Sequence, residues 1–364
     1  MPSALTTATV LIVVPARNEE DSIGRCLESL LGQQGVAFQI TVVDDGSSDG
    51  TRAIAKSFAR VGVIRASEPA SGAIGKSNAL IQGAAGPPAR WLLFTDADTV
   101  HYPGSLAKAV AEAEERGVDL LSYSPEQETI SWGERVLLPV IFAELTRVYP
   151  SDRVNDPADP TAAANGQYLL VRRDPYLALG GHQAVVDKVL EDVELARLFK
   201  RSGYKIWFRY GAGLVRARMY RDLHSLVEGW TKNLALLFDR PVRLAGLRAA
   251  EFSLIAASLL AAPRLLLIGD HGIGLAILAA GALLYGSFLW RIHRAHFPWV
   301  SNLISVFGLP LFSWLLLRSW LHLRMRGTVT WKGRTYTGLS GPAQSPAPNR
   351  VRETSVHEGS KAEG

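Results

Sequence analysis

Short apolar runs alternate with helix-length segments in the first two thirds of the chain. The runs span residues 10–14, 39–43, 61–65 and 91–94. Helical patterns lie between them, from 21 to 31 and from about residue 49. Strand-sized runs that alternate with helices are typical of a parallel, doubly wound sheet. We therefore predict an α/β domain over residues 1–238, with ligands bound at the carboxyl ends of its strands.

The last third of the chain has a different composition. Segment 252–269 is apolar except for Arg264, and segments 272–290 and 297–317 contain no charged residue. Each is close to the roughly 20 residues that cross the hydrocarbon core of a bilayer. Buried core helices are the alternative, but three such segments in succession, with tryptophans near their ends, favour a membrane domain. We predict this domain over residues 239–322, with two or three transmembrane helices.

The charges around these segments indicate how they are oriented. The N-terminus has no charged n-region and no cleavage site, so the run at 10–14 is expected to be a strand and not a signal peptide. The α/β domain would then stay in the cytoplasm, as the arginines before the first segment favour. Three full crossings would place the basic juxtamembrane segment 323–339 outside. One segment is therefore expected to be interfacial or re-entrant, and the breaks at Pro263 and at 308–310 are the candidates.

Composition narrows the class of protein further. The 364 residues include 39 Lys+Arg and 34 Asp+Glu, a net charge of +5, and 48% are hydrophobic. These values exclude a wholly disordered chain or a collagen, although the Pro/Ser/Gly-rich tail at 340–364 is expected to be disordered and cytoplasmic. Cys26 is the only cysteine, so the chain has no internal disulfide and no thiolate zinc site. In the absence of a nucleic-acid recognition motif, we assign the basic excess to the membrane surface.

Two carboxylates follow the fourth apolar run. Asp96 and Asp98 are separated by one residue, and alternate positions of an extended chain point the same way. Such a pair can approach one hard cation and the phosphates bound to it. A divalent ion there would neutralise the charge on a departing nucleotide diphosphate. The alternative is a solvated turn, because acidic turns are common.

Two further polar motifs close the first two runs. VPARNEE brings Pro15, Asn18 and Glu19 to the end of the first run, and DDGSSDGT brings Asp45 to the end of the second. A helix N-cap accounts for part of the second motif. Two acids before a glycine are more than a cap requires, and a carboxylate there can accept a hydrogen bond from a base or a ribose.

The sequence Gly75-Lys76-Ser77 offers a rival interpretation, the phosphate loop of nucleotide triphosphatases. That loop needs a glycine where Ala70 stands, and no strong strand precedes it, so this class is disfavoured. A dehydrogenase is disfavoured as well, because Arg216 stands where the dinucleotide fingerprint needs a glycine. We expect Lys76 to reach the nucleotide or its phosphates from the start of a helix.

Together these motifs resemble family-2 glycosyltransferases of the GT-A fold. The similarity runs from about residue 9 to 233 through VVPARNEE, VVDDGSSDGT, GKSNAL, TDAD, ANGQYLLVRRDPYLALGG and LEDVELARLFKRSGYKI. The resemblance implies that Asp45 binds the base of a nucleotide-sugar, Asp98 holds Mg²⁺ or Mn²⁺, and Asp192 is the catalytic base. The other candidate substrate-binding residues are Pro15, Asn18, Glu19, Lys76, Asp96, Glu191 and Trp230.

The chemistry of an inverting transfer supports the role of Asp192. A carboxylate must take the proton of the acceptor hydroxyl while its oxygen attacks the anomeric carbon. Asp192 follows Glu191 at the start of a helical pattern, from which a base would be presented rigidly. Stabilisation of the helix dipole is the simpler role for the two acids. The upstream motifs favour the base.

One motif departs from the family pattern. Processive members carry Gln-x-x-Arg-Trp downstream of the base, and in the corresponding stretch EGWTKN only Trp230 matches. This departure implies the transfer of a single sugar and not polymerisation. Two alternatives stay open: Trp230 stacks on an acceptor and Lys232 neutralises phosphate, or both are packing and surface residues.

Within the family, the chain is most similar to bacterial carotenoid glycosyltransferases. The matching stretches are RVNDPADPTAAANGQYLLVRR, GHQAV, LEDVELA, RMY, EGWTKN and VTWKGRTY, and hopene-associated glycosyltransferases share VNDP and TAAA. The resemblance implies a metal-dependent, multi-pass enzyme of the bacterial cytoplasmic membrane that moves one hexose, glucose from UDP-glucose, onto an isoprenoid lipid such as a carotenoid. No obligate protein partner is evident.

The acceptor and the enzymatic activity each have an alternative. A hopanoid or a polyprenyl phosphate would make the chain another glycosyltransferase, whereas a non-catalytic nucleotide-sugar-binding scaffold would need no base. An apolar helix expected at 131–149 either lies at the membrane surface and lines an acceptor entrance, or is plain core.

Overall fold

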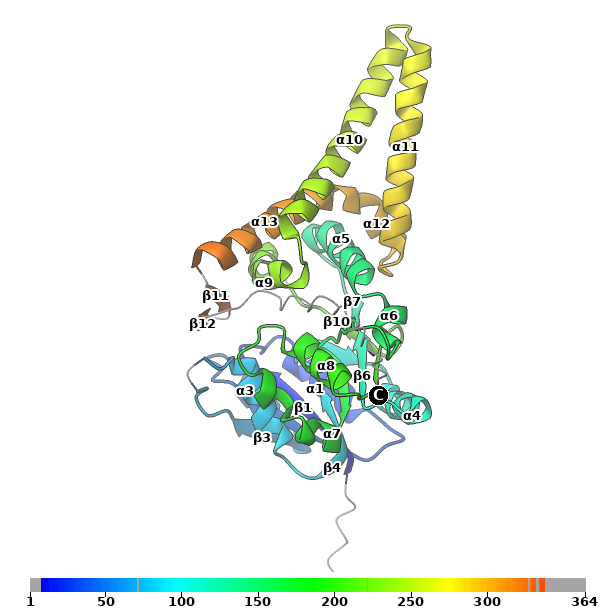
Figure 1. The fold of residues 1–364 in the computed structure, drawn as a ribbon. Coiled ribbons are helices and arrows are strands. Elements are labelled where there is room, and N and C mark those ends of the chain that lie inside the picture. The colour runs from blue at the N-terminus through cyan, green and yellow to red at the C-terminus, as the bar shows by residue number, and fades with distance from the viewer. Residues whose placement is uncertain (1–7, 71, 221, 327, 332–333, 338–364) are drawn as a thin grey trace, which may run out of the picture.

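The structure is a computed structural model that describes residues 8–70, 72–220, 222–326, 328–331 and 334–337. The expected disordered tail at 340–364 lies outside these ranges. Within them the chain forms an α/β domain from which a pair of long helices projects (Figure 1).

A mixed sheet forms the centre of the α/β domain. Among the described residues it has seven strands, in the order β3-β2-β1-β4-β8-β6-β9. Their bounds are Ala8–Ala16 (β1), Phe38–Asp44 (β2), Val61–Arg65 (β3), Ala89–Phe94 (β4), Leu120–Ser124 (β6), Leu169–Arg172 (β8) and Ile206–Tyr210 (β9). The four apolar runs of the sequence are β1 to β4, as predicted.

The sheet departs from the predicted parallel arrangement at one strand. β1 pairs in parallel with β2 and β4, but β8 runs antiparallel to both of its neighbours, β4 and β6. We call the end of the sheet where β1, β2 and β4 finish the carboxyl edge. Because β8 runs the other way, it starts at this edge, and the residues that precede it lie beside the ends of the parallel strands.

Helices cover both faces of the sheet. Val10, Ile12 and Val14 face one apolar cluster, and Leu11 and Val13 face the other, as the alternation of a strand requires. The first cluster is covered by α1 (Ile23–Leu31), α2 (Thr51–Lys56) and α4 (Ser105–Arg116). The second is covered by α3 (Gly75–Ala84), α6 (Ser151–Asn155), α7 (Arg173–Ala178), a 3₁₀ turn (Gly181–Val185) and α8 (Glu191–Arg201).

A third apolar cluster joins the α/β domain to the C-terminal helices. It contains residues of α5 (Trp132–Val148), α9 (Leu223–Leu237), α10 (Pro241–Leu267), α11 (His271–His293) and α13 (Gly308–Arg326). The helix expected at 131–149 is α5, which begins with a capping box between Ser131 and Glu134. Its apolar residues, such as Leu137 and Ile141, are buried in this cluster, so most of the helix is core.

Three apolar stretches among the described helices are long enough to cross a membrane. They are Pro241–Leu267, His271–His293 and Trp299–Met325. The first two form a hairpin, α10 and α11, and only 17% of the apolar window of each is buried within the protein. Pro263 lies inside α10 and does not end it.

The third apolar stretch is broken and packs against the α/β domain. It consists of α12 (Trp299–Ile304), a 3₁₀ turn (Ser305–Phe307) and α13, and half of its window, 50%, is buried. A Cβ on Gly308 would lie 2.0 Å from the carbonyl oxygen of Val136, so the backbone of α13 rests directly on α5. The break expected at 308–310 therefore coincides with the start of α13, which runs across the base of the α10–α11 hairpin (Figure 1).

Two short sheets complete the described structure. β5 (Thr99–His101), β10 (Val215–Ala217) and β7 (Glu126–Gln127) form one of them, next to the carboxyl edge. β11 (Thr328–Trp331) and β12 (Arg334–Thr337) form an antiparallel hairpin within the segment that the sequence marked only as basic.

A cluster of charged side chains ties the membrane hairpin to α5. The Glu144 side chain is only 1% exposed, and its Oε1 lies 2.8 Å from Nε of Arg248 in α10. Arg291 in α11 places Nη2 2.8 Å from Oε2 of Glu251, which also pairs with Arg248 at 2.7 Å. Such a cluster is costly to break, because the partners that remain are left buried without a counter-charge.

We predict that Glu144→Ala destabilises the protein, because it leaves the arginines of α10 and α11 short of a counter-charge. The loss should be about 3 kcal/mol and appear as a lower thermal midpoint in detergent. The matched control is Glu114→Ala, which removes an exposed pair with Arg90 and should cost at most about 1 kcal/mol. Equal midpoints for the two variants would show that the buried cluster does not hold the hairpin.

Candidate active site

The polar motifs of the sequence meet in one cavity at the carboxyl edge. The cavity has a volume of about 640 Å³ and lies beyond the ends of β1 and β4. All the residues that the sequence analysis named as site candidates line it: Pro15, Asn18, Glu19, Asp45, Lys76, Asp96, Asp98, Glu191, Asp192 and Trp230. The fold thus brings together residues that are up to about 200 positions apart in the chain.

Hydrogen bonds join the first two motifs at one end of the cavity. Asn18 has a φ of 52°, in the left-handed region that Asn tolerates better than most residues. Its Oδ1 accepts a hydrogen bond from the backbone N–H of Ser48 at 2.9 Å. The backbone N–H of Glu19 donates to Oγ1 of Thr51 at 2.7 Å. The two loops therefore form one wall.

The two adjacent acids of DDGSSDGT have different environments. Oδ1 of Asp44 accepts a hydrogen bond from the N–H of Ser47 at 3.0 Å, so this side chain fixes the turn. Asp45 lines the cavity and is only 5% exposed, while its carbonyl accepts a bond from Nη1 of Arg17 at 2.6 Å. Asp45 is thus the acid of the pair that a ligand can meet.

Lys76 forms ion pairs with two carboxylates at the carboxyl edge. It lies in the first turn of α3, and its Nζ is 2.8 Å from Oδ1 of Asp96 and 3.0 Å from Oε1 of Glu191. Burial alone would lower the pKa of the ammonium, but the negative charges of Asp96, Glu191 and Asp192 outweigh it and hold that pKa well above its usual range. Lys76 therefore stays charged and screens the acids from one another.

Asp192 is held by backbone hydrogen bonds and has a raised pKa. Its Oδ2 accepts a hydrogen bond from the N–H of Gly166 at 2.7 Å, and its Oδ1 accepts one from the N–H of Val193 at 2.8 Å. Burial and the negative charge of Glu191 raise the pKa of Asp192 to about 6, although Lys76 and the two backbone N–H groups oppose the rise. This carboxyl is ionised at neutral pH and still has appreciable affinity for a proton.

The loop before β8 contributes residues to which the sequence analysis gave no role. A Cβ on Gly166 would lie 3.1 Å from Nζ of Lys76 and 3.5 Å from Oδ2 of Asp192, so glycine leaves room for both groups. Nε2 of Gln167 is 3.5 Å from both carboxylate oxygens of Asp98. The only sequence signal was Asn165-Gly166, a pair typical of a turn, within a stretch used for the family resemblance.

The acids at the end of β4 provide oxygen ligands but no complete metal cage. Among the described residues, no three His, Cys, Asp or Glu side chains cluster to hold an ion by themselves. Mg²⁺ typically binds one or two carboxylates and completes its shell with water and substrate phosphates. Asp98 and Asp96 both line the cavity and fit that incomplete donor set, although Asp96 is already paired with Lys76.

Trp230 and Lys232 lie on α9 above the same cavity. The Trp230 side chain is 3% exposed, and its ring centroid is 6.2 Å from those of Phe142 and Tyr220. This packing accounts for most of the indole surface. Lys232 also lines the cavity, and burial lowers its pKa although the nearby acids oppose the shift. Lys232 is therefore no surface residue.

Comparison with known proteins finds a family model and relatives that the chain resembles. The model of the family "Glycosyl transferase family 2" matches residues 11–180. A 4,4'-diaponeurosporenoate glycosyltransferase of Staphylococcus aureus strain MRSA252 is 29% identical over 342 residues, which cover 90% of this chain and 88% of the relative. Its counterpart in strain USA300 is 28% identical over 341 residues, with the same coverage.

A solved structure has the same fold. A mannosyltransferase of Pyrobaculum calidifontis, solved with GDP-Man and Mn²⁺, aligns with a TM-score of 0.54. The alignment covers 88% of each chain at 17% sequence identity. The likeness thus extends beyond the central sheet to the C-terminal helices, and at this identity it concerns the fold alone.

We predict that Lys76→Met raises the pKa of Asp192 above about 6, because the substitution removes a positive charge that favours the carboxylate. Infrared difference titration of the protonated carboxyl band would measure the shift, with Asp192→Asn identifying the band. Lys188→Met, which removes an exposed lysine paired with Asp187, is the control and should leave the titration unchanged. An unshifted band in Lys76→Met would contradict the assigned electrostatics.

Proposed function

Because the chain is a family-2 glycosyltransferase with a GT-A fold, we propose that it transfers one hexose, glucose from UDP-glucose, to a hydroxyl or carboxyl group of a membrane isoprenoid such as a carotenoid. The observation that carries this acceptor is the similarity to the S. aureus 4,4'-diaponeurosporenoate glycosyltransferases, which extends over 90% of the chain and so includes the C-terminal helices. The absence of the Gln-x-x-Arg part of the processive motif supports the transfer of a single sugar.

Asp192 acts as the base of an inverting displacement. The acceptor oxygen forms a bond to the anomeric carbon while the bond from that carbon to the diphosphate breaks on the opposite side. A hydroxyl acceptor passes its proton to the carboxylate of Asp192, which is held by two backbone N–H groups and has a pKa of about 6. A carboxyl acceptor is already ionised at neutral pH and attacks without this proton transfer. A base with a pKa near the working pH combines a large ionised fraction with a useful proton affinity.

The remaining site residues bind the donor. Asp45 recognises the nucleotide between the joined loops of Pro15, Asn18 and Glu19. Lys76 and Lys232 bring positive charge to the side of the cavity where the diphosphate lies. Asp98, with Asp96, would hold Mg²⁺ or Mn²⁺, which supplies positive charge that stabilises the departing diphosphate. The P. calidifontis mannosyltransferase, which shares the fold, was solved with GDP-Man and Mn²⁺.

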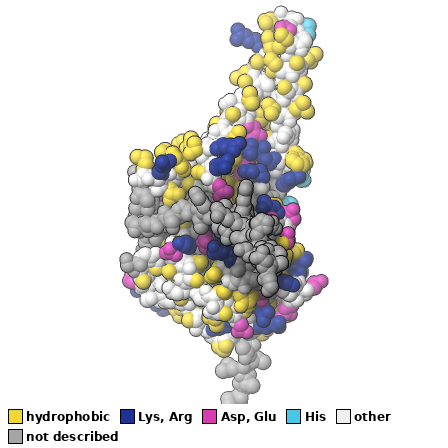
Figure 2. Space-filling view, viewed as in Figure 1, with side chains coloured by type: hydrophobic (Ala, Val, Ile, Leu, Met, Phe, Trp, Pro, Cys, Tyr) yellow, Lys and Arg dark blue, Asp and Glu magenta, His cyan; other side chains and the backbone are white. Residues whose placement is uncertain are grey.

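Burial of the apolar helices supports a specific arrangement in the bacterial cytoplasmic membrane. The hairpin α10–α11 crosses the bilayer, because its apolar windows are largely exposed on the protein. α13 lies in the interface, because it packs on α5 and α9 and half of its window is buried. Figure 2 shows hydrophobic side chains covering the hairpin and Lys and Arg side chains gathered at its base. The catalytic domain and the residues after α13 would then share the cytoplasmic face.

The proposed transfer predicts a specific loss in Asp192→Asn. Purified protein in detergent, supplied with Mn²⁺, radiolabelled UDP-glucose and a lipid extract that contains hydroxylated carotenoids, should move label into the carotenoid fraction. Asp192→Asn should lower that rate by about 100- to 10,000-fold, because the amide cannot accept the proton. Glu194→Gln, which alters the same helix at a residue paired with Arg197, should retain activity.

The other outcomes of this assay would change the acceptor, the base or the enzymatic activity that we propose. Label in a hopanoid or polyprenyl phosphate fraction would keep the enzyme class and replace the acceptor. Near-normal transfer by Asp192→Asn would refute the assigned base. Absence of label with every nucleotide-sugar tested would favour the non-catalytic scaffold.

The proposed metal site predicts that a chelator abolishes transfer and that Mn²⁺ or Mg²⁺ restores it. Asp98→Asn should raise the metal concentration for half-maximal activity by about tenfold or more, because a neutral amide is a weaker ligand than a carboxylate. Asp187→Asn, at an exposed position outside the cavity, is the control. Full activity after removal of divalent ions would contradict a metal-dependent enzyme.

A further inference from the structure

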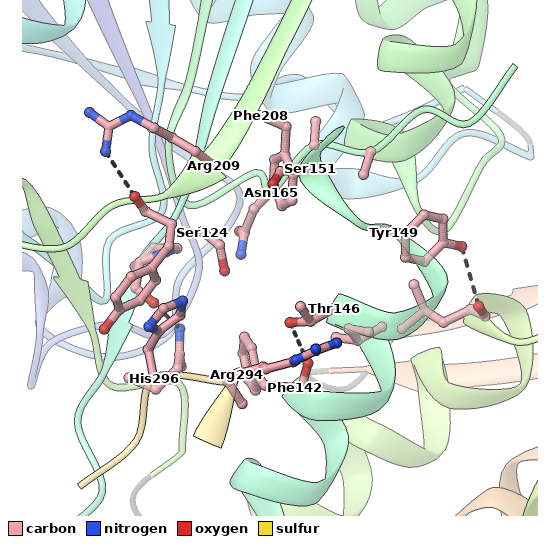
Figure 3. A pocket seen from close by; sticks show the side chains of 18 of the residues that line it. Ser124, Phe142, Thr146, Tyr149, Ser151, Asn165, Phe208, Arg209, Arg294 and His296 are labelled. Atoms are coloured by element: carbon pink, nitrogen blue, oxygen red, sulfur yellow. Dashed lines mark hydrogen bonds between the residues drawn. The ribbon is translucent and has the colours of Figure 1, made fainter. Parts of the chain in front are cut away.

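A second, smaller cavity lies beside the catalytic one. It has a volume of about 180 Å³ and is enclosed by α5, the edge strand β9, the loop at 163–165 and the segment 294–297 (Figure 3). None of the candidate site residues lines it. Its function is therefore separate from donor binding and from the reacting carboxylates.

The two cavities are adjacent and share part of their lining. The residues that line both are Phe142, Leu145, Ala164, Asn165, Val193 and Leu237. Val193 directly follows the base Asp192, and Asn165 directly precedes Gly166, which donates to that base. A molecule in the small cavity therefore lies next to the reacting end of the large one.

The opposite wall belongs to the membrane side of the protein. Residues 294–297 follow α11, which is one of the membrane-spanning helices. The ring of Phe297 lies 5.7 Å from that of Phe142 on α5. His296 has a φ of 63° and stacks on Tyr210 at 4.3 Å between ring centroids, with planes 6° apart. Segment 294–297 is therefore packed against both α5 and β9, and it connects α11 to the side of the catalytic domain that holds the small cavity.

The lining of the small cavity suits a hydrocarbon. Phe142, Leu145, Phe208, Leu237 and Phe297 are the large apolar side chains of its wall. An apolar cavity of about 150 Å³ takes up benzene, so this space accommodates a short stretch of chain or one ring. Polar side chains, among them Ser124, Asn165 and Arg294, also line the cavity, so the hydrocarbon would pack against the apolar part of the lining.

We propose that the small cavity binds the hydrocarbon segment of the isoprenoid acceptor that adjoins its reacting oxygen. The segment reaches the cavity from the end of α11 at the membrane, and the oxygen emerges beside Asp192. Burial of the apolar segment places the oxygen at a fixed distance from the base and keeps the rest of the lipid in the bilayer. This proposal rests on the proposed function, because it requires a lipid acceptor.

A single introduced thiol tests the occupant of the small cavity. Thr146 is an exposed residue of α5 that lines the small cavity and not the catalytic one, and its hydroxyl donates only to the carbonyl of Phe142 at 2.9 Å. Cys26 is fully buried, and burial raises the pKa of its thiol to about 12, so it should not react. Thr146→Cys can therefore be alkylated selectively. Arg135→Cys, on an exposed part of the same helix outside both cavities, is the matched control.

The probe is 4,4'-diaponeurosporenoate in detergent micelles, together with an alkyl maleimide. We expect the acceptor to slow alkylation of Thr146→Cys about tenfold and to leave Arg135→Cys unaffected. Complete alkylation of Thr146→Cys should lower sugar transfer at least about tenfold relative to the same protein before alkylation. Its hydrolysis of UDP-glucose without acceptor should change less than about twofold, because the donor cavity stays open.

The outcomes separate this proposal from the proposed function. If wild-type enzyme glycosylates a hopanoid or a polyprenyl phosphate in place of the carotenoid, the acceptor was misassigned, and protection by that lipid still supports the cavity. Transfer by the wild type, with no protection by the lipid that it glycosylates and no loss on alkylation, would overturn the cavity's role. Loss of donor hydrolysis on alkylation would also overturn it, since the site would then serve the donor.

Discussion

The positive charge of the Lys76 ammonium allows several carboxylates to lie close together at the carboxyl edge. A sheet of this topology brings the acids after β4 and those at the start of α8 to the same place, and carboxylates this close repel one another strongly when partly buried. Lys76 lies 2.8 Å from Asp96 and 3.0 Å from Glu191, and its charge also opposes the rise in the pKa of Asp192. Without this cation, Asp192 would be protonated over more of the neutral pH range.

Local sequence patterns were enough to predict the strands and helices that carry the site. These elements have either a continuous apolar run or a distinctive polar motif at one end. The runs that became β1 to β4 and the helix starts at Lys76 and Glu191 lie where they were predicted. The order of the motifs was also enough to identify the family. These signals depend on a few neighbouring residues, and so they can be read without knowledge of the tertiary structure.

The parts that could not be predicted depend on contacts between distant segments. The antiparallel course of β8 follows from the path of the chain before it, and only that course brings Gly166 within 2.7 Å of Asp192. The pairing of Lys76 with Glu191 joins positions more than a hundred residues apart. The burial of Trp230 depends on α5 and α13 packing around α9, which no spacing within EGWTKN reveals.

In the proposed function, two cavities that share a wall bring a water-soluble donor and a lipid together. If Asp192 takes the acceptor proton while the diphosphate leaves from the opposite side, the configuration of the anomeric carbon must invert. The most direct measurement is the NMR spectrum of the anomeric proton in the glycolipid made from UDP-glucose, whose glucose is α-linked. A β-linked product is the result expected of this geometry. An α-linked product would contradict it, because retention needs a different arrangement of nucleophile and leaving group.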